Sequence, residues 1–268
     1  MMNAPNDWQI PGNWVEIYER VFVPAMMGWA AQVIALAQPQ PEDHVLDVAC
    51  GTGALTRNVA NLVGQRGRIV GLDISPEMLT IARTMPLDNS QSAPVEWYEG
   101  DAHALPFDDE TFDIVFSAFG FMFFSDRIAV LKEMGRVLKP AGRLALSVWG
   151  PINKSPGQVA LKESWERHFG LEAGTGFSRM HVLSDPELVR TLLDEAGFSH
   201  VLVEPTMGVV RHRSPESMVR SVGAMFGTQA DEQTRTKLIQ EVSEALSSFV
   251  GSEGLVYPIE AILASARK

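Results

Sequence analysis

Short apolar runs rich in β-branched residues alternate along the chain with longer segments whose apolar residues recur every three or four positions. The runs occupy residues 44–49, 68–72, 95–98, 112–117 and 142–148, and the helical patterns occupy 54–63, 76–82 and 126–138. Such alternation predicts an α/β fold in which parallel strands are joined by crossover helices. Helix starts are marked by Ser75-Pro76, Asp185-Pro186 and Ser214-Pro215, each a capping residue followed by proline. The segment 139–142 (Lys-Pro-Ala-Gly) predicts a turn from a helix into the next strand.

The pattern changes after Trp149. Residues 151–184 carry prolines and glycines around one helical piece, 158–168, and their length suggests a lid. A strand at 200–204 follows, with 209–212 as a candidate continuation, then a mostly helical stretch at 214–249 and a last apolar strand at 259–266. We expect a doubly wound core with helical insertions. The domains we predict are an N-terminal helical lid segment (1–43), a nucleoside-binding core (44–150), a lid insertion (151–184), and the rest of the core (185–268) with an insertion at 214–249.

Composition narrows the class of protein. Hydrophobic residues make up 46% of the 268 residues, which argues against disorder, and the formal net charge of -11 disfavours nucleic-acid partners because phosphate backbones require cations. The single cysteine, Cys50, cannot form an intramolecular disulfide, and the N-terminus carries no signal-peptide pattern. The apolar stretch 21–37 is interrupted by Pro24 and predicted to be too short to span a bilayer. We therefore expect a cytoplasmic protein, a monomer or homodimer, with no membrane span.

The most specific motif is V-L-D-V-A-C-G-T-G at residues 45–53, a buried strand that runs into a glycine-rich turn and a helix. Gly51 and Gly53 allow the backbone to approach a ligand closely, and Asp47 lies near the carboxyl end of the strand, where open α/β sheets bind ligands. A dinucleotide site would require a third glycine where this chain has Thr56.

Two further elements follow the next strands. In the segment 67–79, Asp73 ends the second predicted strand, 20 residues beyond Gly53, where an acid accepts hydrogen bonds from ribose hydroxyls. Ile74 and Met78 could cover an adenine face. In E-G-D-A-H-A-L-P-F, residues 99–107, Asp101 and the N–H of Ala102 could bind the adenine edge, whereas the alternative for Asp101 is a turn-forming role. The following strand delivers Ser117 and Phe119 to the same rim.

These four elements, in this order and spacing, resemble the class I S-adenosylmethionine-dependent methyltransferases, in particular the group similar to the ubiquinone and menaquinone C-methyltransferases. The resemblance covers about residues 44–150 and includes M-G-R-V-L-K-P-A-G-R-L at 134–144. It implies a Rossmann-like seven-stranded sheet with an antiparallel last strand, and S-adenosyl-L-methionine as cofactor. It further implies that the cofactor lies among residues of the glycine turn and the following strand ends, with an N-terminal aromatic residue closing over it: Tyr18, Asp47, Ala49, Gly51, Thr52, Gly53, Asp73, Ile74, Met78, Gly100, Asp101, Ala102 and Ser117.

The chemistry expected is in-line methyl transfer to a small organic acceptor, which mainly requires positioning and exclusion of water. Apolar side chains in the two insertions (Trp165, Phe169, Phe177, Met218, Met225 and Phe226) suggest a partly apolar acceptor. No catalytic residue is assigned. His181 and Tyr18 are candidate bases for a carbon or phenol acceptor, Cys50 is not expected to act as a nucleophile, and the histidines show no metal-ligand spacing, with His103 expected to face solvent.

Two alternatives stay open from the sequence. A nicotinamide-dependent oxidoreductase also uses a glycine turn and a distal acid, although Thr56 and the Gly-Asp-Ala element argue against it. A protein that binds S-adenosylmethionine without transferring methyl groups would show the same cofactor motifs.

Overall fold

The computed structural model describes residues 8–87 and 91–268. The contacts divide the chain into two compact units. Unit 1 comprises residues up to Met26, Pro151–Val182 and Met207–Glu260; unit 2 comprises Met27–Gly150, Leu183–Thr206 and Ala261–Lys268.

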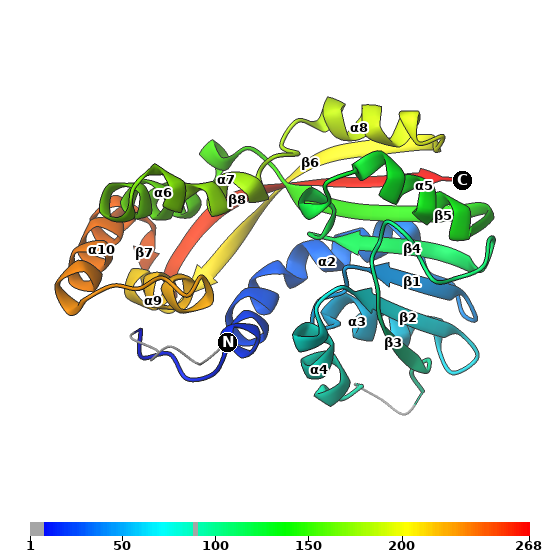
Figure 1. Cartoon of the computed structure of the whole chain (residues 1–268), viewed down its shortest axis with the longest axis horizontal. Coiled ribbons are helices and arrows are strands. Elements are labelled where there is room, and N and C mark those ends of the chain that lie inside the picture. Colours follow the sequence, from blue (N-terminus) through cyan, green and yellow to red (C-terminus); the bar gives the residue numbers. More distant parts are fainter. Residues whose placement is uncertain (1–7, 88–90) are drawn as a thin grey trace. The chain divides into compact units, whose positions relative to one another are not determined.

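The described chain forms one eight-stranded sheet with the order β3-β2-β1-β4-β5-β8-β6, and β7 pairs with β8 (Figure 1). The strands are β1 His44–Val48, β2 Arg68–Asp73, β3 Val95–Glu99, β4 Phe112–Ala118, β5 Leu138–Trp149, β6 Ser199–His212, β7 Val250–Gly251 and β8 Gly254–Arg267. The first five strands in this order, β3, β2, β1, β4 and β5, are parallel to one another, and β8 is antiparallel to β5. The predicted Rossmann-like α/β sheet with its antiparallel last strand is confirmed; the two-residue β7 was not predicted.

The strand order reverses direction between β1 and β4. Parallel strands on the two sides of such a point send their connections to opposite faces, which leaves a crevice at their carboxyl ends. Both strands are buried along almost their whole length, as expected for central strands covered by helices. The fold therefore places any nucleoside site at the ends of β1 and β4 and of β2 beside them.

Four helices of unit 2 begin within a residue of where the sequence predicts: α3 Ala54–Val63, α4 Pro76–Thr84, α5 Arg127–Val137 and α8 Pro186–Glu195. Unit 2 also contains most of α2 (Val23–Ala37) and a 3-10 turn at Phe121–Phe123. Ser75, Asp126 and Asp185 accept backbone N–H groups in the first turns of α4, α5 and α8. The turn predicted at 139–142 lies inside β5 as an irregularity, with Ala141 at a φ of +62°.

The N-terminal helix is longer than the sequence pattern predicts. α1 (Trp14–Ile17), a π-helical segment (Tyr18–Phe22) and α2 (Val23–Ala37) follow one another without a break. Pro24 cannot donate to the carbonyl four residues earlier, and the wider π turn just before it keeps the helix continuous. The resulting 24-residue helix, Trp14–Ala37, is long and apolar enough by length and composition to cross a membrane, which corrects the expectation of a short, interrupted segment. A third of its most apolar window is buried in the fold.

Unit 1 has its own aromatic core. Its helices are α1, α6 Pro156–Phe169, α7 Thr175–Met180, α9 Pro215–Met225 and α10 Glu232–Ala245, with 3-10 turns at Ile152–Lys154, Leu171–Gly174 and Ser247–Phe249. Trp165, Phe177 and Met218 are each 1% exposed, and Trp8 stacks on Trp165. Trp165, Phe177 and Met218, which the sequence suggested as contacts of an apolar acceptor, therefore belong to the core of unit 1.

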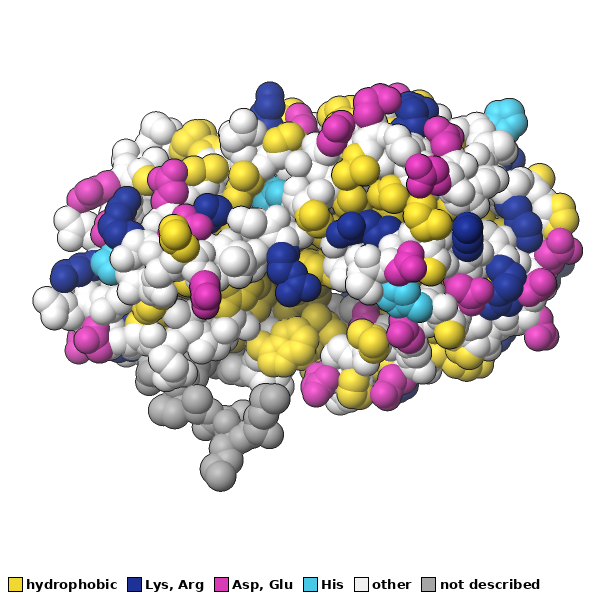
Figure 2. Space-filling model, turned by 45° about the horizontal axis from the view of Figure 1, so that its top comes forward, with side chains coloured by type: hydrophobic (Ala, Val, Ile, Leu, Met, Phe, Trp, Pro, Cys, Tyr) yellow, Lys and Arg dark blue, Asp and Glu magenta, His cyan; other side chains and the backbone are white. Residues whose placement is uncertain are grey.

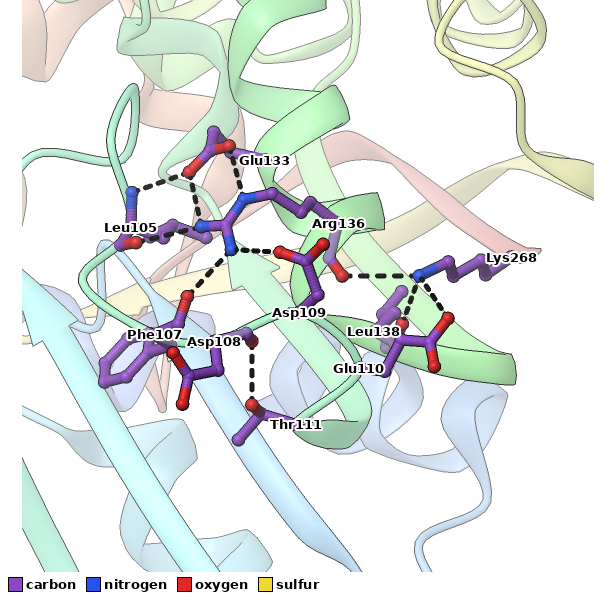
Figure 3. A network of polar contacts seen from close by, with 10 residues as sticks. All are labelled: Leu105, Phe107, Asp108, Asp109, Glu110, Thr111, Glu133, Arg136, Leu138 and Lys268. Carbon is purple, nitrogen blue, oxygen red and sulfur yellow. Dashed lines mark hydrogen bonds and ion pairs between the residues drawn. The ribbon is translucent and has the colours of Figure 1, made fainter.

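A network around Arg136 fixes the loop between β3 and β4 (Figure 3). The Arg136 guanidinium donates to the carboxylates of Glu133 and Asp109 and to the carbonyls of Leu105 and Phe107, at 2.7 to 2.9 Å. Glu133 in turn accepts the N–H of Leu105. Because two carboxylates and two backbone carbonyls share one planar cation through five hydrogen bonds, the loop after Asp101 is held in a single path.

Candidate cofactor site

The turn after β1 is built from left-handed residues. Ala49, Gly51 and Gly53 have φ angles of +57°, +57° and +79°, and α3 begins at Ala54. Glycine adopts this region without cost, whereas Ala49 does so under strain, and strained backbone in folded proteins is concentrated at functional sites. The N–H of Cys50 donates to the carbonyl of Leu72 at 3.0 Å, which ties the turn to the end of β2.

Asp73, at the end of β2, holds this turn in place. Its Oδ2 accepts the N–H of Gly51 at 2.7 Å, and its Oδ1 accepts the N–H of Ser75 at 2.9 Å. The residue is 9% exposed, so both oxygens are largely shielded from water. Each carboxylate oxygen has a second lone pair, which remains available for a ribose hydroxyl. Asp73 thus shapes the glycine turn, a role that the sequence alone did not indicate.

Asp47 and Thr56 form a buried pair beneath the turn. The Thr56 hydroxyl donates to Oδ2 of Asp47 at 2.6 Å, and both side chains are essentially inaccessible. Burial raises the pKa of Asp47 to about 7, against the hydrogen bond from Thr56, and the negative charge of Asp73 adds to the rise. From the sequence, Thr56 was considered only as the residue that replaces a third glycine. A hydroxyl side chain among the buried, mostly apolar positions of α3 was the signal that could have indicated a buried partner for Asp47.

Gly53 and Gly71 make room for the indole of Trp97 on β3. A Cβ atom at Gly71 would lie 2.5 Å from the ring, and one at Gly53 would also overlap it. Gly71 pairs with Trp97 across the β2–β3 ladder, so the ring lies along the sheet toward the start of α3. Gly53 is therefore constrained twice, by its left-handed backbone and by this ring. Trp97 was not predicted as a site residue from the sequence.

The ends of β1 and β4 touch at the point where the strand order reverses. A Cβ atom at Gly120 would lie 2.6 Å from that of Ala49 and 3.1 Å from Oγ of Ser117. Phe119, between them, is left-handed at a φ of +54°, and its N–H donates to the carbonyl of Ser147 at 3.0 Å. The structure thus brings the predicted residues Ala49 and Ser117 together at the sheet edge.

Two buried hydroxyls in this region lack a hydrogen-bond partner among the described residues. They are Oγ1 of Thr52, in the glycine turn, and Oγ of Ser117, at the end of β4. Buried hydroxyls without partners are unfavourable, and a polar ligand would supply the missing bonds. Together with the open lone pairs of Asp73, these orphan groups fit a nucleoside that carries hydroxyl and amino groups, as S-adenosylmethionine does.

The loop after β3 carries the groups expected to bind adenine. Asp101 is more than half exposed, and its Oδ1 accepts the N–H of His103 at 2.9 Å and lies 2.7 Å from Nδ1 of the same residue. The hydrogen bond from the backbone N–H of His103 lowers the pKa of Asp101 most, and the hydrogen bond to the His103 ring lowers it further. His103 does not simply face solvent as expected, because this contact and the ring of Phe124 flank it. Gly100 donates to the carbonyl of Asp73, and Ala102 is buried.

Ile74 and Met78 follow β2. Ile74 is 69% exposed, unusual for a side chain of its size, and Met78 is half-buried in the first turn of α4. An exposed isoleucine beside Asp73 is consistent with a surface that a flat ring would cover. Tyr18 belongs to unit 1, in the π-helical segment, where it stacks on Phe22 at 6.4 Å. Its role as a lid residue remains a prediction.

Cys50 has a protonated thiol at neutral pH. Burial, followed by the charges of Asp47 and Asp73, raises its pKa well above the ordinary value. A thiol rather than a thiolate is a poor nucleophile, in keeping with the expectation that Cys50 does not act in covalent catalysis. Among the described residues, no group of three or more potential ligands could hold a metal ion.

Comparison with known proteins agrees with this arrangement. The family model described as the ubiE/COQ5 methyltransferase family matches residues 25–165. The ubiquinone/menaquinone biosynthesis C-methyltransferase UbiE of Ectopseudomonas mendocina is 34% identical over 203 residues, which cover 69% of this chain and 77% of that protein. Among solved structures, the YcgJ protein from Bacillus subtilis superposes with a TM-score of 0.60 at 19% identity, over 90% of this chain and 98% of that one. A SAM-dependent methyltransferase from Aquifex aeolicus superposes with a TM-score of 0.50 at 18% identity, over 94% of this chain and 99% of that one.

The fold, the glycine turn and the acidic strand ends define an S-adenosylmethionine-dependent methyltransferase. The extent of the family match and the identity to the E. mendocina enzyme also identify the family within this class. The chain belongs to the ubiE/COQ5 methyltransferase family. This membership gives the nicotinamide-dependent alternative no support.

Proposed function

We propose that the chain transfers a methyl group from S-adenosylmethionine to a small, partly apolar organic acceptor, such as a quinone precursor, at a carbon, oxygen or nitrogen nucleophile. The relative from E. mendocina is named for ubiquinone and menaquinone biosynthesis, which supports an acceptor of this kind. The observation that carries the proposal is a buried aromatic cluster in unit 2 beside the predicted cofactor residue Ser117.

The cluster consists of Trp29, Phe119 and Trp149. Phe119 and Trp149 stack at 4.0 Å between ring centroids, and Trp29 meets both edge-on, at 6.3 and 5.4 Å. Phe119 and Trp149 lie at the carboxyl ends of β4 and β5, and Phe119 is two residues from Ser117. Aromatic faces favour planar apolar acceptors and attract a sulfonium cation. The Nε1 of Trp29 is buried and has no partner among the described residues, so it is a candidate donor to an acceptor oxygen.

We assign the cofactor to the residues at the ends of β1, β2, β3 and β4. The bound cofactor supplies an electrophilic methyl group on a good leaving group. The glycine turn and Asp47 would hold its amino-acid portion, Asp73 its ribose, and the loop at Asp101 its adenine. The chain's own contribution is to bind, orient and exclude water, which can account for several kcal/mol of the barrier.

We assign no catalytic residue. Tyr18 and His181 remain candidate bases for a carbon or phenol acceptor, and both lie in unit 1. We also propose that residues 1–43, 151–184 and 214–249 serve as lid or insertion segments around the core at 44–150. Closure of such segments would shield the reacting atoms from water.

We further propose a cytoplasmic monomer or homodimer that acts on small molecules and not on nucleic acid. The net charge of -11 supports this, and Lys and Arg side chains are interspersed with acidic ones over the face in Figure 2. We propose that the apolar helix Trp14–Ala37 packs within the fold and does not span a bilayer, since Trp29, Val33 and Ala37 are buried on one side of it.

The proposal is tested with S-adenosylmethionine labelled in its methyl group. The protein is incubated with a panel of hydroquinones, phenols, amines, a peptide mixture and transfer RNA, and labelled products are identified by mass spectrometry. We expect label in hydroquinones or phenols and none in peptide or RNA. Label in peptide or RNA alone would refute the small-molecule proposal.

A further inference from the structure

Unit 1 contains a cavity whose charged lining residues, among those the structure describes, are all arginines. It has a volume of about 640 Å³ and is enclosed by residues before α1, by the π-helical segment and start of α2, by the end of β6 and by α9. Three arginines line it, Arg20, Arg211 and Arg213, and no acidic residue is among its described lining. In a chain with 11 more acidic than basic groups, this concentration of guanidinium groups is unexpected.

The arginines have unused hydrogen-bonding capacity. Arg213 has no ion pair within residues 8–87 and 91–268, and Arg211 reaches only Glu253, at 4.0 Å between two exposed side chains. Arg20 donates one bond, to the carbonyl of Pro11 at 2.8 Å. A guanidinium carries five N–H donors arranged to grip a carboxylate or phosphate with two parallel bonds. Most of these donors are free for a ligand.

The remainder of the lining is apolar. Pro11, Val21, Pro24 and Ala25 contribute hydrocarbon surface, and the volume lies in the range of small-molecule sites. His212, also in the lining, stacks on Tyr257 at 6.1 Å, and burial lowers its pKa to about 4. His212 therefore stays neutral at physiological pH and adds a flat, uncharged surface between two arginines.

We propose that this cavity binds a small amphipathic organic anion, with an apolar body against Val21, Pro24 and Ala25 and a single anionic head group against Arg211 and Arg213. The hydroxyls of Ser217 and Ser221 donate to the backbone carbonyls of Ser214 and Ser217. Their protons are therefore already used, and the arginines are the donors left for the head group. All of the described lining residues belong to unit 1. The proposed anion site does not depend on the identity of the proposed methyl acceptor.

The test uses a matched pair of fluorescent probes with the same ring system. 1-Anilinonaphthalene-8-sulfonate carries an anionic group, and N-phenyl-1-naphthylamine lacks it. We expect the full chain to bind the sulfonate about tenfold more tightly than the neutral probe, and decanoate, but not decanol, to displace it. Equal affinity for the two probes would overturn the proposal.

Variants locate the site. The double variant Arg211→Gln and Arg213→Gln should bind the sulfonate probe about tenfold more weakly and the neutral probe with unchanged affinity. Arg179 is an exposed arginine of the same unit outside the cavity, so Arg179→Gln should change neither affinity. Ala25→Phe, which fills the cavity, should weaken both probes. Equal losses in Arg179→Gln and the double variant, or full binding by Ala25→Phe, would place the probes elsewhere and refute the site.

Discussion

The hydroxyl of Thr56 on α3 donates to the carboxylate of Asp47 on β1 at 2.6 Å, inside a region closed to solvent. A carboxyl in this setting binds its proton more tightly in the folded chain than in the unfolded one, because burial raises its pKa to about 7. The pair therefore couples the stability of the fold to pH around neutrality.

Replacing Asp47 by asparagine should abolish this coupling. The unfolded carboxyl ionises near pH 3.9, so its contribution to stability is complete below that pH and is lost as pH rises toward about 7. Between pH 5 and 8 the free energy of unfolding of wild type should fall by about 2 to 3 kcal/mol relative to Asp47→Asn. Urea titrations of both proteins at several pH values measure this difference. A constant difference would show that Asp47 is charged throughout.

Replacing Thr56 by valine should move the same transition to higher pH. The hydroxyl donates to the carboxylate and lowers the pKa of Asp47. Without the hydroxyl, burial should raise that pKa further. Thr56→Ser keeps the donor and serves as the matched control. For each Thr56 variant, the free energy of unfolding is compared with that of the double variant that also carries Asp47→Asn. The pH at which this difference is half lost reports the pKa of Asp47 in that variant. A midpoint for Thr56→Val equal to that of Thr56→Ser would contradict the role assigned to the hydroxyl.

Replacing Asp73 by asparagine should weaken cofactor binding. The amide has one acceptor oxygen, so it cannot serve both Gly51 and Ser75, and the glycine turn loses one of its anchors. We expect the affinity for S-adenosylhomocysteine, measured by calorimetry, to fall about tenfold or more. Glu77→Gln, at an exposed acid in the first turn of α4, should leave the affinity unchanged. Wild-type affinity in Asp73→Asn would remove Asp73 from the cofactor site.

Replacing Trp29 by phenylalanine should separate acceptor binding from cofactor binding. The smaller ring retains most contacts with Phe119 and Trp149 but lacks the buried, unpartnered Nε1. Affinity for S-adenosylhomocysteine should stay within about twofold of wild type, while kcat/KM for an oxygen-bearing acceptor falls about tenfold. Trp14→Phe, at an exposed tryptophan of the same helix, is the control. An unchanged kcat/KM would show that the indole N–H does not contact the acceptor.

The sequence predicted the sheet, its helices and the glycine turn because these depend on local signals: apolar periodicity, capping residues and glycine spacing. It did not predict the partners that distant segments supply. Thr56 beneath Asp47, Trp97 over Gly71 and the anchoring of Gly51 by Asp73 arise when separate strands and helices meet. No spacing rule in a single sequence encodes those contacts.

The length of the N-terminal helix was missed for a different reason. Pro24 ordinarily ends or kinks a helix, and the sequence gives no sign that a π turn will accommodate it. The apolar side chains of residues 151–184 and 214–249 were interpreted as signs of an apolar acceptor, but Trp165 and Phe177 are buried in the core of unit 1 itself. Apolar composition alone cannot distinguish a core from a binding surface.

Substituting Gly71 tests whether the packing of Trp97 determines the glycine. Gly71→Ala places a methyl group 2.5 Å from the indole and should destabilise the protein by about 1 to 3 kcal/mol, because β2 is buried and cannot move aside. Trp97→Leu removes the overlap, so the double variant should be more stable than the sum of the two single effects predicts. Gly28→Ala, in α2 with no atom within 4 Å of the new methyl group, should instead stabilise the protein by about 0.5 to 1 kcal/mol. Thermal and urea unfolding of the four proteins measure the coupling. Strict additivity of Gly71→Ala and Trp97→Leu would mean that the glycine is required for the backbone of β2 and not for the ring.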